Sequence, residues 1–328
     1  MFVTPVLFIV FNRPQETKQV FEAIRQRAPA YLYIAADGPR DNKAGEKELC
    51  EQVRQIVAAV DWPCEVKTFL REQNAGCRRA VSEAITWFFS HVEQGIILED
   101  DCLPDASFFT YCQVLLEKYK DDESIISIGG TNLGYRFEGN HSYAFARFMN
   151  MWGWATWKRA AKMVDYNMQH WKKLPFKNLF LQKKLQRDIF KLDYNWIKFW
   201  KNYFNLTASG AMDTWDYQWI FTQLLYKKLS VFPAQNLIKN IGFSKGATHT
   251  FDPGHPVTKL MVQSMTFPLQ HPSDKGADAH YEENFIKKVW FPYRKDSLYR
   301  IIRSDFLNKP VVSKAIQYFK SKNFKEGT

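Results

Sequence analysis

The sequence of 328 residues has no long hydrophobic run, which limits the classes of protein it can belong to. No stretch reaches the roughly 18 consecutive apolar residues that a membrane-spanning helix needs. The chain opens directly on an apolar segment, residues 5–11, with no basic leader and no A-x-A cleavage site. Internal repeats and low-complexity tracts are also lacking. These absences predict a globular protein without a signal peptide.

Cysteine is scarce, and its spacing forms no recognisable pattern. There are five cysteines, an odd number, and no two have the C-x-x-C spacing. A disulfide scaffold or a zinc site is therefore not expected, and the thiols are predicted to be reduced. Reduced thiols favour a cytoplasmic location.

Three nucleotide-binding motifs are missing. No G-x-G-x-x-G follows the first predicted strand, which argues against a nicotinamide Rossmann site. No G-x-x-x-x-G-K-[ST] occurs, which excludes a P-loop enzyme. A G-x-G-T-R-type loop near the N-terminus is lacking as well, which weighs against a nucleotidyltransferase.

Aromatic residues and positive charge are abundant. Hydrophobic residues make up 46% of the chain and aromatic residues 16%, and the formal net charge is +11. This charge predicts an anionic partner such as nucleotide phosphates, acidic lipid headgroups or an acidic glycan. A nucleic-acid-binding protein is a weaker alternative, because the basic residues do not form one compact stripe.

Short apolar runs alternate with amphipathic segments over the first 130 residues. This alternation is typical of βαβ units and predicts a mostly parallel, doubly wound α/β sheet with helices on both faces. The predicted strands are residues 6–11, 31–36, 65–70, 96–98 and 125–128. The predicted helices lie between them, starting near Pro14 and covering residues 46–60, 77–88 and 108–119.

Three consecutive acids, Glu99, Asp100 and Asp101, follow the fourth predicted strand. Carboxylates this close repel one another unless a cation or fixed donor compensates them. Ligands of open α/β sheets bind beyond the carboxyl ends of the strands, where these acids are expected. Our hypothesis is that the three acids hold a divalent metal, which in turn holds a diphosphate. The alternative is a solvated turn that leads into the helix starting near Asp105.

Polar residues also follow the other predicted strands: Arg13 after the first, Asp37 after the second, and Arg71 and Asn74 after the third. We expect them to converge on the edge that carries the acids. Asp37 has the alternative interpretation of a plain Asp-Gly turn, and Asn74 that of a helix cap.

The pattern changes after about residue 130. Residues 149–157 are dense in tryptophan, and we expect at least two of Trp152, Trp154 and Trp157 to be core. Helices are predicted around residues 181–192 and 196–204, and another opens near residues 212–219. Residues 232–241 look like a strand, residues 242–250 like a glycine-punctuated loop, 256–272 like irregular structure, and 281–325 like helical pieces.

This ordered set of motifs resembles the GT-A glycosyltransferases. It consists of N-R-P, D-G, R-x-x-N-x-G and E-D-D after successive strands, followed later by an aromatic-flanked W-D. It is similar to the N-acetylglucosaminyltransferase I-like family, and G-W-A-T-W and N-I-G-F-x-x-x-A-T-H-T resemble bacterial surface-polysaccharide glycosyltransferases. The resemblance covers about residues 3–250. The chain departs from the family-two pattern in having E-D-D instead of D-x-D, and only one acid follows Trp215.

The resemblance implies a GT-A-like fold with a mixed α/β acceptor region. Residues 1–130 would be the nucleotide-sugar-binding half, and residues 131–255 the acceptor-binding and catalytic half of the same domain. Residues 256–328 would form a basic, aromatic C-terminal segment.

The resemblance also implies roles for single residues at the donor site. Asp101 would be the ligand of Mn²⁺ or Mg²⁺, with His249 as a second ligand or a phosphate contact. The residues implied to contact the donor are Arg13, Asp37, Arg71, Asn74, Glu99, Asp100 and Lys245. For Arg13 and Arg71 the expected contact is with phosphate or nucleotide, and for Asp37 it is with the base.

Asp216 is the candidate general base, which would remove the acceptor hydroxyl proton in an inverting transfer. Trp215 and Trp154 are the candidate acceptor contacts. The alternative for this segment is structural, with Asp213 as the N-cap of the helix and Asp216 in its first turn.

The resulting prediction is a metal-dependent, inverting glycosyltransferase that uses a nucleotide-sugar, expected to be a UDP-sugar, and a glycan or lipid-linked glycan acceptor. The basic, aromatic segments 174–203 and 285–325 would contact anionic lipid at the inner face of the cell membrane. The alternatives are a nucleotidyltransferase and a non-catalytic nucleic-acid- or glycan-binding protein. No nucleic-acid partner is expected for the favoured hypothesis.

Overall fold

The computed structural model describes residues 2–148, 150–184, 194–243 and 260–284. The chain divides into two compact units, Met1–Glu283 and Asn284–Thr328, and the central sheet with its covering helices belongs to the first. The division of the chain at residues 130 and 255 stays a prediction. No helix in the described ranges combines the length and apolar character that crossing a bilayer requires.

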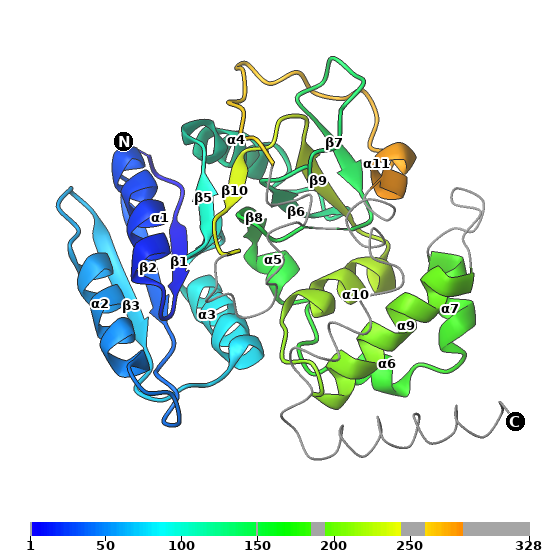
Figure 1. Cartoon of the computed structure of the whole chain (residues 1–328). Helices are drawn as coiled ribbons and strands as arrows, with labels where there is room; N and C mark the ends of the chain where they lie inside the picture. Colours follow the sequence, from blue (N-terminus) through cyan, green and yellow to red (C-terminus); the bar gives the residue numbers. More distant parts are fainter. Residues whose placement is uncertain (1, 149, 185–193, 244–259, 285–328) are drawn as a thin grey trace, which may run out of the picture. The chain divides into compact units, whose positions relative to one another are not determined.

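An eight-stranded mixed sheet forms the centre of the first unit, in the order β3-β2-β1-β4-β8-β6-β9-β7 (Figure 1). Strands β3, β2, β1 and β4 pair in parallel, as do β6 and β9, whereas β8 is antiparallel to both neighbours and β7 to β9. The strands are β1 (Val6–Val10), β2 (Tyr31–Ala36), β3 (Glu65–Leu70), β4 (Gln94–Glu99), β6 (Ile125–Gly129), β7 (Tyr143–Ala146), β8 (Trp154–Trp157) and β9 (Leu229–Pro233). The predicted mostly parallel α/β sheet is confirmed.

Helices cover both faces of this sheet, which confirms the doubly wound arrangement. On one face, Phe8 and Val10 of β1 pack in a core with Val20 and Phe21 of α1, together with residues of α2 and α4. On the other face, Leu7 belongs to a second core with residues of α3, α5 and α10. The helices of these two layers are α1 (Pro14–Arg27), α2 (Glu46–Ala58), α3 (Cys77–His91), α4 (Ala106–Lys118), α5 (Lys158–Ala161) and α10 (Asp216–Tyr226).

The tryptophan-rich segment forms β8, which the sequence pattern did not identify as a strand. Trp154 and Trp157 are 1% and 3% exposed, whereas Trp152 is partly buried at the edge of the core. The expectation that at least two of the three are core is confirmed. Trp154 stacks on Trp215 with ring centroids 5.8 Å apart and meets Trp219 edge-on at 4.9 Å, which fixes α10 against the sheet.

Three further helices adjoin α10: α6 (Gln169–Lys173), α7 (Lys177–Lys184) and α9 (Tyr194–Ser209). They share an aromatic core in which Trp171 packs edge-on against Phe204 and Phe221. The predicted helix at 196–204 is part of α9. The one predicted at 181–192 corresponds at its start to α7, and its remainder lies outside the described residues.

The segment predicted as one strand at 232–241 is split in two. β9 ends at Pro233, and a second strand, β10 (Ile238–Asn240), pairs antiparallel with β5 (Cys102–Pro104). Pro233 lacks an N–H group, so it cannot continue the ladder as a donor. Because β5 directly follows the three acids, this small sheet brings the later part of the chain next to them. A last short helix, α11 (Ala279–Asn284), closes the described region.

Candidate active site

The candidate site lies where the winding of the sheet reverses. From β1 the chain proceeds to β2 and β3 on one side, and α3 then carries it back to β4 on the other side of β1. The crevice beyond the carboxyl ends of two such strands is where open α/β sheets bind ligands. Arg13 follows β1 and the three acids follow β4, so both predicted motifs lie at this point.

Arg13 and the acids are in direct contact. Its Nη1 donates to Asp101 Oδ2 at 2.7 Å and lies 3.4 Å from Asp100 Oδ1. The backbone N–H of Phe11, at the end of β1, donates to Asp100 Oδ2 at 3.2 Å. The Asp101 side chain is 20% exposed, whereas Asp100 is buried. Asp101 therefore offers the more accessible carboxylate.

The carboxylates at this point are not fully compensated in charge. Burial raises the pKa of Asp100 to about 7, although Arg13 lowers it and Asp101 raises it. Burial also raises the pKa of Glu99 well above its usual range, and the charges of Asp101, Asp100 and Asp216 raise it further. Ionising these two acids is costly chiefly because they are removed from water, and a bound cation would lower that cost.

Asp216 is the first residue of α10, and the electrostatic effect on Glu99 shows that the two carboxylates are close. Its Oδ1 accepts from the N–H of Tyr217 at 2.9 Å and from the hydroxyl of Thr214. Its other oxygen, Oδ2, makes no hydrogen bond in the described part of the chain. The half-buried carboxylate thus has one oxygen held in place and one available to a substrate. The predicted position of Asp216 in the first turn of its helix is confirmed.

Asp213 does not cap this helix, so that part of the structural alternative is wrong. Its carboxylate accepts from the N–H groups of Cys77 and Arg78 at 2.8 and 3.1 Å, and thereby caps α3. The preceding Gly76 has φ +80°, and a Cβ there would lie 2.7 Å from Asp213 Oδ2. A contact between residues 136 positions apart leaves no local sequence signal, which is why it was missed.

Asp37 and Asn74 lie together between the ends of β2 and β3. Asp37 accepts from Asn74 Nδ2 and from the N–H groups of Gly38 and Ala75, each at 2.9 Å. Burial raises the pKa of Asp37, and the backbone hydrogen bonds from Ala75 and Gly38 lower it. Both side chains therefore hold the two loops together, and the N-cap position of α3 is occupied by Gly76 rather than by Asn74. Contact with a donor stays a prediction for each.

Arg71 follows β3 but turns toward α3. Its guanidinium pairs with Glu83 and lies 4.7 Å from the centroid of the Phe69 ring. The side chain is 18% exposed, so phosphate contact by Arg71 stays a prediction that would need this pair to rearrange.

Sequence analysis missed a second ion pair that borders the crevice. Glu46, which is 4% exposed, accepts from Asn12 Nδ2 at 2.9 Å and from Arg40 Nε at 2.8 Å. The pair locks the loop after β1 to the loop after β2. The only local signal is that Asn12 and Arg40 each lie just beyond a strand, within N-R-P and D-G-P-R.

The side chains at this point offer few ligand atoms to a divalent metal. Among the described residues, no three His, Cys, Asp or Glu side chains come together in a way that could hold an ion. Lys245 and His249 lie outside the described residues, so their predicted roles stay predictions. The partly exposed carboxylate of Asp101 fits a one-ligand site, in which substrate phosphates and water supply the remaining oxygens of Mg²⁺ or Mn²⁺.

Ile241 and Gly242 contact Asp101. The N–H of Ile241 donates to the carbonyl oxygen of Asp101 at 2.8 Å. A Cβ on Gly242 would lie 2.3 Å from Asp101 Oδ2, so only glycine allows this approach. Gly242, with which the predicted glycine-punctuated loop begins, therefore lies against the acid cluster, and ligand contact by the loop stays a prediction.

Trp154 and Trp215, predicted as acceptor contacts, are 1% and 4% exposed. Their indoles stack on each other and face protein atoms, where the sequence prediction placed an acceptor sugar. Contact of Trp154 and Trp215 with an acceptor stays a prediction.

Comparison with known proteins gives little further guidance. No family model matches the chain, and no curated protein matches its sequence. Similar solved structures include mouse xyloside xylosyltransferase 1 (9% identity, TM-score 0.33), with 68% of this chain and 82% of that chain covered. They also include HddC from Yersinia pseudotuberculosis (10%, TM-score 0.30; 48% and 78% covered). A third is a cytidylyltransferase from Leptospira borgpetersenii (9%, TM-score 0.29; 49% and 63% covered). At these TM-scores the likenesses carry no functional argument.

Proposed function

We propose that this chain is a metal-dependent glycosyltransferase that moves a sugar from a nucleoside-diphosphate donor, a UDP-sugar in our hypothesis, to a glycan or lipid-linked glycan. The observation that carries the proposal is the contact between Arg13 and the acids Asp100 and Asp101 at the reversal point of the sheet, with Asp216 in electrostatic reach. The positive charge of Arg13 is thus available there for phosphate, and the negative charges of the carboxylates are available for a cation or a proton.

In this proposal Asp101 and the diphosphate of the donor hold Mn²⁺ or Mg²⁺. When bound, such an ion neutralises the charge that develops on the leaving diphosphate. In the loaded site Arg13 would bind phosphate oxygens of the donor as a fixed cation in place of its present pair with Asp101. Asp100, which also accepts from the backbone of Phe11, holds the loop in position and accepts from a donor hydroxyl.

Asp216 acts as the general base. A hydroxyl oxygen of the acceptor forms a bond to the anomeric carbon, while the bond from that carbon to the diphosphate oxygen breaks. The hydroxyl proton passes to the Asp216 carboxylate, and the bonding electron pair leaves with the diphosphate. Attack from the face opposite the diphosphate inverts the anomeric centre.

A nucleotidyltransferase is the alternative that the same sheet edge could serve, because it also uses acids beyond strand ends. The two reactions differ in their products. Sugar transfer releases a nucleoside diphosphate, whereas nucleotidyl transfer consumes a nucleoside triphosphate and releases pyrophosphate.

The proposal is tested by ligand-induced thermal shift. UDP with Mn²⁺ should raise the melting temperature of the wild-type protein, and Asp101→Ala should abolish the shift. The exposed Glu51 of α2 gives a matched control, Glu51→Gln, which should leave the shift unchanged. If UDP without metal stabilises the protein equally well, the role of Asp101 is wrong.

A further inference from the structure

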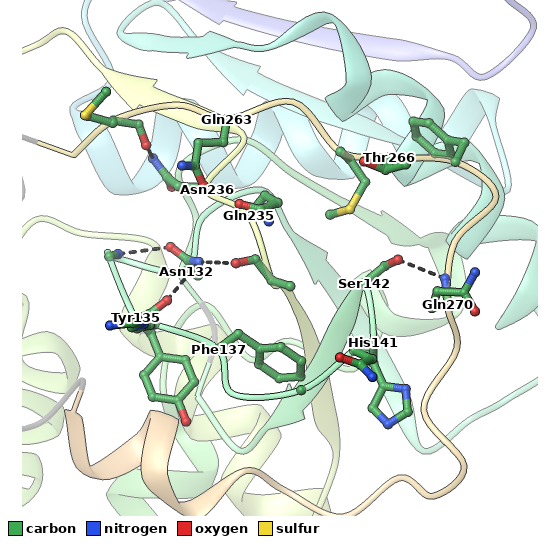
Figure 2. A pocket seen from close by; sticks show the side chains of 18 of the residues that line it. Asn132, Tyr135, Phe137, His141, Ser142, Gln235, Asn236, Gln263, Thr266 and Gln270 are labelled. Atoms are coloured by element: carbon green, nitrogen blue, oxygen red, sulfur yellow. Dashed lines mark hydrogen bonds between the residues drawn. The ribbon is translucent and has the colours of Figure 1, made fainter.

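A cavity of about 690 Å³ lies apart from the acid cluster but on the same edge of the sheet. It is lined by residues of the loop that follows β6, from Asn132 to Ser142 but without Leu133 and Glu138, by residues 234–236, which follow β9, and by residues between 260 and 270 (Figure 2). β8 is antiparallel to both β4 and β6, and β9 is parallel to β6, so β4, β6 and β9 all end at this edge. A volume of this size is typical of a small-molecule site.

The lining differs in chemistry from the acid cluster. Among the lining residues that the structure describes, none is Asp, Glu or Lys, and the ionisable side chains are Arg136, His141 and Tyr135. Six of its side chains carry amides: Asn132, Asn140, Gln235, Asn236, Gln263 and Gln270. In a chain with a net charge of +11, a cavity wall so poor in charge favours a neutral ligand.

Two of these amides build the walls. Asn132 Nδ2 donates to the carbonyl oxygens of Ala234 and Tyr135 at 2.8 and 3.2 Å, and its Oδ1 accepts from the N–H of Gly134 at 3.0 Å. Asn236, which is buried, donates to the carbonyl oxygens of Ile238 and Met261 at 3.0 and 3.2 Å. The three lining segments are thereby tied to one another, so the cavity is formed before any ligand binds.

Other polar groups of the lining are left available. In the part of the chain that the structure describes, the side-chain amides of Gln235, Gln263 and Gln270 make no hydrogen bond. Each amide offers two donors and one acceptor oxygen, which suits the vicinal hydroxyls of a sugar. The half-buried ring of Phe137 lies at the cavity, as Figure 2 shows, and can pack against the apolar face of a sugar ring. The ring of Tyr135 packs edge-on against Phe232 and Tyr281 instead.

The cavity is connected to the candidate active site by β10. Asn236 is in the cavity wall, whereas Gly242 lies against Asp101. They are six positions apart in the sequence, so their Cα atoms are at most about 22 Å apart. A glycan bound in the cavity could therefore extend toward Asp101 and Asp216.

We propose that this cavity binds the non-reacting part of a neutral glycan acceptor through the amides of Gln235, Gln263 and Gln270 and the ring of Phe137. That the bound glycan is the acceptor of a transfer reaction rests on the proposed function. That the cavity binds a neutral glycan rests only on the residues that line it. In this proposal the cavity, and not the buried Trp154 and Trp215, holds the acceptor.

The test is a calorimetric titration of the full chain, without donor, with neutral tri- and tetrasaccharides of glucose, galactose and N-acetylglucosamine. At least one should bind, and Gln235→Ala and Phe137→Ala should each weaken binding at least tenfold. Gln52→Ala and Leu49→Ala change exposed residues of α2 outside the lining and should leave the affinity unchanged. Gln235→Ala should keep the thermal shift with UDP and Mn²⁺.

The outcomes separate this inference from the proposed function. If no neutral saccharide binds while the UDP shift persists, the acceptor inference is wrong and the donor site stands. If binding survives both Gln235→Ala and Phe137→Ala, or if only uronate- or sialate-containing glycans bind, the neutral site is overturned. If saccharide binds but UDP with Mn²⁺ gives no shift, the cavity is retained as a glycan site and the transferase proposal fails.

Discussion

The carboxylates near the crevice differ in their hydrogen bonding, and this difference indicates which of them are structural. Asp213 is fully occupied by the N–H groups that begin α3, and Glu46 by Arg40 and Asn12. Asp101 is paired yet partly exposed, and Asp216 keeps one oxygen unbonded within the described residues. The hydrogen bonds, not the residue type, therefore distinguish structural acids from candidate functional ones.

Replacing Asp216 by asparagine should separate chemistry from binding. Asparagine keeps an oxygen that can accept from the N–H of Tyr217, so α10 should remain folded. Without a base, sugar transfer should fall at least 100-fold, whereas the thermal shift with UDP and Mn²⁺ should persist. Turnover is measured as released UDP, and undiminished turnover would assign the base to another residue.

Glu46 should make the stability of the protein sensitive to acid. The hydrogen bond from Arg40 lowers the pKa of Glu46 below its ordinary value of 4.5. Between the lowered and the ordinary pKa the unfolded chain binds more protons, so stability rises with pH through this window and is lost as pH falls. At pH 7, Glu46→Gln should reduce the free energy of unfolding by about 1–3 kcal/mol.

The difference in free energy of unfolding between wild type and Glu46→Gln should become smaller below pH 4.5, because the carboxylate of Glu46 then also becomes neutral. Urea unfolding at pH 7 and pH 4 measures it, with Glu51→Gln as the control for an exposed acid on the same helix. A difference that does not change with pH would show that the charge of Glu46 contributes nothing.

At the level of elements, the N-terminus of α3 is capped by Asp213, a residue distant in the sequence. The N-cap residue Gly76 has no side chain to satisfy the first N–H groups, and Asp213 does so instead. Asp213→Ala should destabilise the protein by about 1 kcal/mol, and Asp213→Asn, which keeps an acceptor oxygen, by less. Equal stability of wild type and Asp213→Ala in urea unfolding would contradict this capping role.

The elements of the first half could be predicted because their signals are local. Residues 6–10 and 31–36 are continuous apolar runs, and both form strands with buried interiors. The site could be predicted only in outline. The position of Arg13 beside Asp101 follows from the sheet order, but the Asp213 cap and the pairing of Asn240 with Cys102 join distant segments. β8 was missed because its four residues, Trp154–Trp157, are too few to stand out as an apolar run like those of β1 and β2.

At the scale of the whole molecule, the positive charge is consistent with an anionic surface as a further partner. Phe176 is 81% exposed, with φ +48°, and lies beside the exposed Lys172 and Lys173. An apolar side chain among lysines is suited to the interface of an anionic bilayer. Such a contact would bring a lipid-linked acceptor to the protein.

The full chain should therefore bind vesicles that contain phosphatidylserine more strongly than neutral vesicles. Phe176→Ser should weaken this binding several-fold, and raising the salt concentration should weaken it further because the attraction is electrostatic. Co-sedimentation measures both effects. Equal binding of wild type and Phe176→Ser would exclude this residue from any membrane contact.

The central claim is that the crevice between the ends of β1 and β4 binds a metal diphosphate. The most direct measurement is the anomalous scattering of manganese in crystals grown with UDP and Mn²⁺. We expect a peak beside the Asp101 carboxylate, with the diphosphate in contact with it and with Arg13 released from its present pair. A diphosphate bound at another place, with Arg13 still on Asp101, would contradict the proposal.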